Sequence, residues 1–93
     1  MRDILIKYVR DKSRKPIGMV VAVKQEKEPF TLGWSLCNKK DKWNRDIAKK
    51  IAIGRAYNIS HRDEVFTYYD VPESLHDEVH NMNVRANRYF KGD

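Results

Sequence analysis

The sequence of 93 residues has little of several features that define common protein classes. It contains a single cysteine, Cys37, so no disulfide can form within the chain, and we expect a protein of a reducing compartment. No run of about 18 apolar residues occurs, which argues against a transmembrane helix. The first residues, MRDILIKYVRD, are too charged for a signal peptide. We therefore expect a cytoplasmic protein without a membrane partner.

Signatures of catalysis and of nucleotide binding are also scarce. The four glycines form neither a P-loop nor a dinucleotide fingerprint, and no GxSxG turn surrounds a serine. Cys37 lies at the end of a predicted strand, where a lone cysteine is more typical of a small buried apolar residue than of a nucleophile. We therefore expect a protein that is not an enzyme and that uses no cofactor.

The strongest metal-binding pattern is HDEVH at residues 76–80. His76 and His80 are four residues apart on one helical face, the spacing that lets two imidazoles bind one zinc ion. In the HExxH zinc peptidases a glutamate follows the first histidine, but here Asp77 takes that place and reaches a metal-bound water poorly. No cluster of cysteines and histidines supplies a third ligand. We predict no metal site, and a zinc enzyme built on His76 and His80 stays a remote alternative.

Acidic and basic residues are unevenly distributed along the chain. The net charge is +6, but residues 63–80 contain six acidic side chains and no lysine or arginine. The remainder therefore has 19 basic against 7 acidic residues, a net charge of +12. This excess favours an anionic partner, although solubility and acids at a helix start explain part of the pattern.

The hydrophobic pattern predicts a single domain, residues 1–93, with an α+β fold. Strands are expected at 3–10, 17–25 and 30–38, joined by short polar turns that are typical of an antiparallel sheet. The third strand alternates between two faces. One face carries Phe30, Leu32, Trp34 and Leu36, and the other carries Thr31, Gly33, Ser35 and Cys37.

Two helices and a further strand are expected after this sheet. A helix over 41–57 would begin after Asn38 or Asp41 as the N-cap, and its buried stripe would be Trp43, Ile47, Ile51 and Ala52. A strand or extended connection at 64–71 precedes a second amphipathic helix within 70–91, with Leu75, Val79, Met82, Ala86 and Phe90 buried. The predicted order is β-β-β-α-β-α, a sheet of three to four strands with both helices packed on one face.

The candidate binding residues are basic and aromatic. Lys39, Lys40, Lys42, Arg45 and Lys49 form an array that suits phosphate groups, although a lysine-rich helix face is also simply a solvated face. Because lysines dominate this array, base-specific recognition is not expected. Tyr68 and Tyr69 lie in the acidic segment and are candidates for a protein interface, where aromatic residues are enriched.

The strings IGMVVAV, GWSLCNKKDKW and IAIGRA fall within residues 17–56. They resemble small, mostly uncharacterised proteins of tailed bacteriophages and prophages, in which the GWSLCNKKD junction and the helix end IAxGRA recur. The resemblance implies a phage origin and expression in a bacterial cytoplasm, and it implies no reaction. Many small accessory proteins of phages act by binding a host factor.

These observations lead to a hypothesis of a non-enzymatic binding protein. We expect it to dock on a host protein or ribonucleoprotein complex that handles nucleic acid or provides defence, and to inhibit it, as an anti-CRISPR protein does. The alternative is direct, largely sequence-independent binding of DNA, RNA or a nucleotide by the basic helix. An open edge in so small a sheet also allows a homodimer.

Overall fold

The computed structural model describes residues 3–25, 29–38, 40–61 and 71–90. Strands β1 (Ile4–Arg10), β2 (Pro16–Lys24) and β3 (Phe30–Leu36) form one antiparallel sheet in the order β1-β2-β3. Helix α1 (Arg45–His61) follows, and a 3₁₀ turn, η2 (Glu73–Leu75), leads into helix α2 (His76–Phe90). The predicted α+β class is confirmed. The strand predicted at 64–71 falls, except for Val71, outside the described residues, so the described order is β-β-β-α-α.

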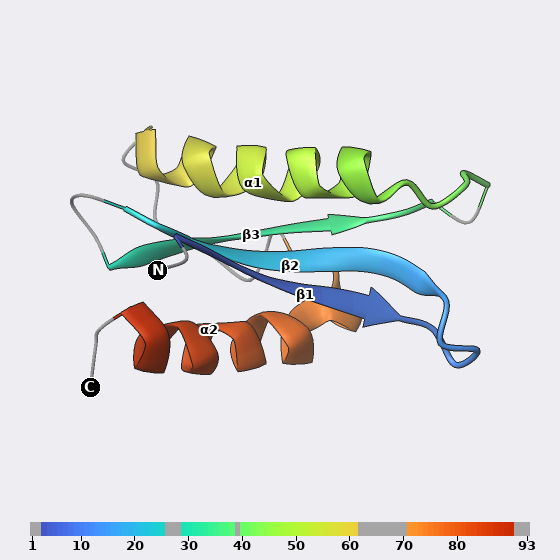
Figure 1. Ribbon diagram of the computed structural model, residues 1–93. Coiled ribbons are helices and arrows are strands. Elements are labelled where there is room, and N and C mark those ends of the chain that lie inside the picture. The colour runs from blue at the N-terminus through green and yellow to red at the C-terminus, as the bar shows by residue number, and fades with distance from the viewer. Residues whose placement is uncertain (1–2, 26–28, 39, 62–70, 91–93) are drawn as a thin grey trace.

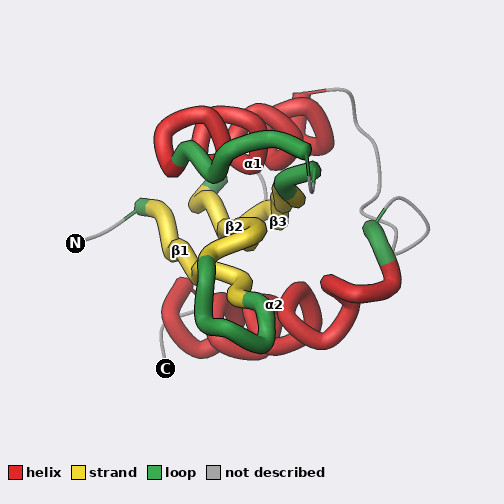
Figure 2. Tube along the Cα trace, turned by 90° about the vertical axis from the view of Figure 1, so that its right-hand side faces the viewer, coloured by secondary structure: helices red, strands yellow, loops and turns green. Residues whose placement is uncertain are grey.

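The two helices cover opposite faces of the sheet, so the prediction that both pack on one face is wrong (Figures 1 and 2). The physical reason lies in β2, the central strand. Its Val20 and Ala22 belong to the core beneath α2, while Met19, Val21 and Val23 belong to the core beneath α1. A strand that is apolar on both faces requires cover on both, because each face buries its own row of side chains.

The core between the sheet and α2 follows the predicted helical stripe. Leu75, Val79, Met82 and Ala86 are buried there, and Phe90 is partly buried against the same core. The phenyl ring of Phe90 stacks on that of Phe30 from β3, with 6.0 Å between the ring centroids. The amphipathic spacing therefore predicted correctly which face of α2 is buried.

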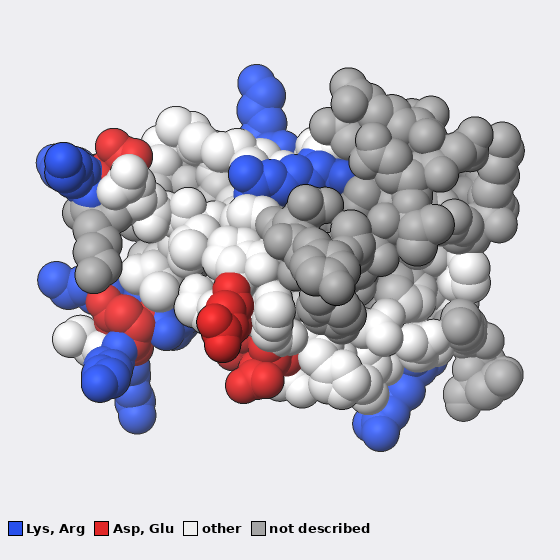
Figure 3. Space-filling view, turned by 180° about the vertical axis from the view of Figure 1, so that it is seen from behind, with Lys and Arg blue, Asp and Glu red and all other residues white. Residues whose placement is uncertain are grey.

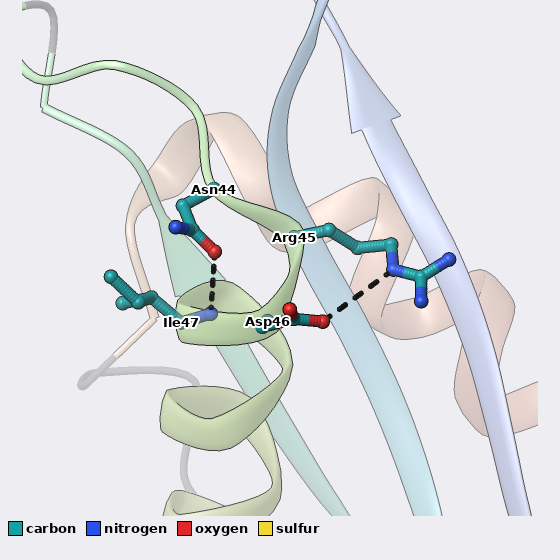
Figure 4. A network of polar contacts seen from close by, with 4 residues as sticks. All are labelled: Asn44, Arg45, Asp46 and Ile47. Atoms are coloured by element: carbon teal, nitrogen blue, oxygen red, sulfur yellow. Dashed lines mark hydrogen bonds and ion pairs between the residues drawn. The ribbon is translucent and has the colours of Figure 1, made fainter.

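Helix α1 begins at Arg45, later than predicted, and its N-cap is Asn44. The two predicted N-caps, Asn38 and Asp41, both lie in the preceding loop. The side-chain Oδ1 of Asn44 accepts a hydrogen bond from the backbone N–H of Ile47 at 3.1 Å (Figure 4). This bond satisfies one of the donors that a helix start leaves unpaired. The helix proper starts at Arg45, so Lys42 and Trp43 lie in the preceding loop.

The buried stripe of α1 consists of alanines. Of the predicted stripe, Ala52 is buried and Trp43 is partly buried, but the prediction is wrong for Ile47 and Ile51. Ala48, Ala52 and Ala56 are buried against the sheet, whereas Ile47 and Ile51 are exposed. The alanines meet β3 at Gly33, where an added Cβ would lie 1.9 Å from the carbonyl oxygen of Ala52. Small side chains on both elements therefore let the backbones of α1 and β3 come into direct contact.

Candidate protein-binding groove

A groove of about 460 Å³ opens between the end of β3, the loop that follows it and the first turns of α1. Two of its apolar side chains are well exposed, Ile47 at 57% and Ile51 at 43%, and Leu36 lines it at the end of β3. We call this hollow the α1 groove. The residues that line it are Ser35, Leu36, Cys37, Asn38, Asp41, Lys42, Trp43, Asn44, Ile47, Ala48 and Ile51.

The close packing of α1 explains why these isoleucines are exposed. Each residue of an α-helix is turned by about 100° from the one before it. Because Ala48 and Ala52 face the sheet, Ile47 and Ile51 are turned away to one flank of the helix. They are four residues apart, so they form one apolar row along the groove.

Trp43 belongs both to the core and to the groove. Its indole is half-buried against the core beneath α1 and contacts the ring of Tyr8 edge to face, with the centroids 6.3 Å apart. The same residue lines the α1 groove. Packing against Tyr8 therefore holds one wall of the groove in place, since a pair of aromatic rings in this geometry contributes roughly 1 kcal/mol beyond its burial.

Polar contacts hold the loop that forms the end of the groove. The thiol of Cys37 lies 3.4 Å from the carbonyl oxygens of both Asn38 and Asp41. The N–H of Asp41 donates to the Asn38 carbonyl at 2.9 Å, and the N–H of Lys40 donates to Asn38 Oδ1 at 3.2 Å. Cys37 is half-buried and joins this turn, as expected of a structural cysteine.

The floor of the groove contains an unsatisfied polar atom. Ser35 lies on the α1 face of β3 and is buried, and its hydroxyl has no hydrogen-bond partner among the described residues. A buried hydroxyl without a partner costs roughly 1–3 kcal/mol relative to one that is paired. The groove therefore has, beneath its lining, a buried hydroxyl that lacks a hydrogen-bond partner among the described residues.

The predicted basic residues do not share one helical face. Lys40 and Lys42 lie in the loop before α1, Arg45 is the first residue of the helix, and Lys49 is one turn further on. All four are exposed. Arg45 Nε lies 3.8 Å from Asp46 Oδ1 (Figure 4), but no carboxylate of the described residues lies within ion-pair distance of Lys42 or Lys49. Lys39, Tyr68 and Tyr69 lie outside the described residues.

The fold brings a second basic segment to the same end of the molecule. The turn between β1 and β2 and the loop between β3 and α1 lie at one end (Figure 1), where Lys and Arg side chains are prominent (Figure 3). The side chain of Asp11 organises this turn by accepting hydrogen bonds from the N–H groups of Ser13 and Lys15. Lys12, Arg14 and Lys15 are all exposed there.

The two histidines of HDEVH differ in their surroundings. Nε2 of His76 lies 2.9 Å from the carbonyl oxygen of Val71, at the start of α2, whereas His80 is exposed one turn later. Among the residues that the structure describes, no three His, Cys, Asp or Glu side chains gather closely enough to hold a metal ion.

Comparisons with known proteins found no relative: no family model, no curated protein and no solved structure matches the chain. Within the described part of the chain, no helix is both long and apolar enough to cross a bilayer.

Ile47 and Ile51 are candidate binding residues that sequence reasoning did not identify. It placed both isoleucines in the core because they follow Trp43 at intervals of four residues. The signal that distinguishes them is the second period, Ala48, Ala52 and Ala56, in a chain that also has Gly33 on a neighbouring strand. Small residues at this spacing indicate a helix that lies unusually close to its neighbour.

Proposed function

We propose that this protein acts by binding another protein in the α1 groove. The observation that carries the proposal is the exposure of Ile47 and Ile51 in one row along a hollow. A protein interface has an apolar centre that excludes water and a polar rim, and two adjacent exposed isoleucines beside a groove can supply such a centre.

The rim of the groove indicates the chemistry of the partner. Lys40, Lys42 and Lys50 are exposed around or beside the apolar row, against Asp41 as the one acidic residue that lines the groove. Figure 3 shows uncharged surface between Lys and Arg side chains in the half that contains α1. A complementary surface has one or more apolar anchors surrounded by carboxylates. The apolar contacts would provide most of the affinity, while the charges would raise the association rate and select the partner.

The biological role that we propose is inhibition of a host complex. The resemblance of residues 17–56 to small phage proteins supports a phage source and action in the cytoplasm of a bacterial host. The partner would be a protein or ribonucleoprotein complex that handles nucleic acid or provides defence, and the anti-CRISPR proteins exemplify this role. Tyr68 and Tyr69 stay as proposed further contacts.

The test compares two exposed apolar positions on helices that cover opposite faces of the sheet, Ile47 on α1 and Val84 on α2. Tagged protein is used to isolate partners from bacterial lysate after nuclease treatment, and the partner so identified is purified and titrated. We expect Ile47→Asp to weaken its binding by roughly 30-fold or more, because a charge would replace a central apolar anchor. The matched control is Val84→Asp on α2, which is 39% exposed and should bind as the parent does.

Two outcomes would contradict the proposal. One is a partner that binds Ile47→Asp as tightly as the parent protein while Val84→Asp fails, since the docking surface would then be on α2. The other is the absence of any partner after nuclease treatment, with nucleic acid bound in the untreated sample. Thermal unfolding of each variant shows that lost binding does not reflect a lost fold.

A second candidate function is direct binding of nucleic acid. The observation that favours it is the convergence of Lys12, Arg14 and Lys15 with the loop of Lys40 and Lys42 at one end of the molecule (Figure 1). Such an array neutralises phosphates regardless of base sequence. The isolation from lysate with and without nuclease distinguishes this function from protein docking. Bound material that is lost after nuclease treatment would indicate nucleic-acid binding.

A further inference from the structure

The two edge strands of the sheet, β1 and β3, differ in how far their outward backbone groups are covered. Cys37 donates its N–H to the carbonyl of Ile17 at 2.7 Å, which fixes the alternation of hydrogen bonds between β3 and β2. By this alternation, the backbone groups of Leu32, Trp34 and Leu36 point away from β2. Arg55 of α1 reaches around this edge and donates from Nη1 to the outward carbonyl of Trp34 at 2.7 Å.

The guanidinium group of Arg55 covers the β3 edge at Trp34, where it contacts both the backbone carbonyl and the indole ring. Its Cζ lies 3.8 Å from the centroid of the Trp34 ring, a close cation–π contact. Burial against this ring lowers the pKa of Arg55, yet an arginine stays charged throughout the ordinary pH range. A charged side chain fixed across an edge strand is a common way to prevent a further strand from pairing.

The opposite edge, β1, has no such cover in the described part of the chain. Lys24 donates its N–H to the carbonyl of Asp3 at 2.8 Å, so Asp3, Leu5 and Lys7 direct their backbone groups toward β2. The backbone groups of Ile4, Ile6 and Tyr8 therefore point outward. Arg10 lies over the Tyr8 ring, with its Cζ 5.6 Å from the centroid. Among the described residues, however, no side chain donates to an outward backbone group of β1 as Arg55 does to Trp34.

The side chains of the same three residues are also incompletely covered. Ile4, Ile6 and Tyr8 lie on the α1 face of β1 and are half-buried, packed against the margin of that core. Helix α1 comes into backbone contact with β3, at the far side of the sheet, so its cover over β1 is partial. β1 therefore offers a row of apolar side chains beside a row of backbone groups that have no partner in the described part of the chain.

We propose that a second copy of this chain pairs with β1 in an antiparallel manner, so that two sheets join into one across a two-fold axis. In the pairing centred on Leu5, Ile4 lies opposite Ile6 of the partner subunit, and these two residues exchange backbone hydrogen bonds. The isoleucines of the two copies then extend one apolar row on the α1 face.

Charge complementarity selects a second copy and this register. Side chains that are directly opposite in an antiparallel pair lie on the same face, so the two-fold axis must pass through a residue position. The axis at Leu5 places the exposed Asp3 opposite the partner subunit's Lys7, and does so twice by symmetry. An axis at Lys7 would instead place the two lysines against each other.

The dimer is independent of the proposed docking function. The α1 groove lies beside the end of β3 and meets β1 only through the contact of Trp43 with Tyr8. Because Tyr8 lies outside the paired residues 3–7, both surfaces can be occupied at once. A failed dimer would leave the groove intact, and a failed groove variant would leave the dimer intact.

The first test is a charge-reversal cycle measured by sedimentation equilibrium of the full chain. We expect Lys7→Asp to raise the dimer dissociation constant by roughly 10-fold, because each interface then contains two pairs of opposed carboxylates. The loss should occur although the lower net charge reduces repulsion between the copies. Asp3→Lys combined with Lys7→Asp should return the constant to within about 3-fold of the parent. Lys12→Asp, in the exposed turn, is the matched control and should not weaken the dimer.

The second test reports the register directly. In a Cys37→Ser background, Asp3→Cys combined with Lys7→Cys should give a covalent dimer on mild oxidation, because directly opposite residues in such a pair lie within disulfide distance. Within one chain these positions are separated by four residues of extended strand, too far to cross-link. Ile6→Cys alone serves as the control for a register shifted by one residue.

The proposal is overturned if the parent chain is a monomer at all concentrations up to about 1 mM, the weak limit of specific association. It is equally overturned if a dimer forms but Lys7→Asp does not affect it, or if Ile6→Cys cross-links in place of the Asp3→Cys and Lys7→Cys pair. A monomer that binds an extended segment of another protein along β1 would be a different function of the same edge.

Discussion

Gly33 determines how closely α1 lies against the sheet. A Cβ at this position would lie 1.9 Å from the Ala52 carbonyl oxygen and 2.9 Å from the Ala56 nitrogen. Both are backbone atoms of the helix, so no side chain can rotate to make room. The helix as a whole would have to move, and the alanines that now contact β3 would lose that contact.

We therefore predict that Gly33→Ala lowers the free energy of unfolding by roughly 3 kcal/mol, at the upper end of what overpacking costs. Gly54→Ala is the matched control, since nothing lies within 4 Å of its added Cβ and alanine is the better helix former. It should raise stability by up to about 1 kcal/mol. Urea titrations of both variants measure the two changes. Equal stabilities would mean that α1 does not lie in contact with β3.

At the scale of the element, the start of α1 depends on one side chain. Asn44 Oδ1 accepts the N–H of Ile47, and the Asn44 carbonyl accepts the N–H of Ala48 at 3.0 Å. Asp41, a cap candidate by sequence, is in the loop and makes its described contacts through its backbone. Because the groove is lined from both sides of this start, its shape depends on where the helix begins.

We predict that Asn44→Ala lowers the free energy of unfolding by about 1 kcal/mol, the usual cost of losing an N-cap. Asp41→Ala should change it by less than about 0.5 kcal/mol, as is typical of an exposed position without a special role. Urea titration measures both. A larger loss for Asp41→Ala than for Asn44→Ala would place the cap where the sequence suggested it.

At the scale of the whole molecule, the topology brings basic residues from two separate loops to one end. The β1–β2 turn and the β3–α1 loop are more than 20 residues apart in sequence, yet they meet at one end. Helix α2 runs from that end toward the other, so its last turn, with Arg88, lies at the opposite end (Figure 1).

If the basic end binds nucleic acid, affinity should fall linearly with the logarithm of salt concentration. Lys15→Glu combined with Lys42→Glu should weaken binding to duplex DNA of any sequence and reduce the slope by about 2, near one unit for each lost phosphate contact. Arg88→Glu, an exposed position at the far end, is the matched control and should leave the slope unchanged. Fluorescence anisotropy at several salt concentrations measures these slopes. Equal weakening by Arg88→Glu would indicate a general effect of net charge.

The sequence by itself determined the strands, the two faces of β3 and the buried stripe of α2, because side-chain period alone decides which residues share a face. It did not determine that α1 and α2 lie on opposite faces. Nor did it determine that Ala48, rather than Ile47 and Ile51, joins Ala52 against the sheet. Two helical stripes were available in α1, one large and one small. The choice depended on Gly33, 15 or more residues away, whose missing side chain lets the helix backbone approach the strand. The exposure of Ile47 and Ile51, and with it the α1 groove, was therefore decided by the tertiary structure alone, because it depends on how closely the helix backbone approaches β3.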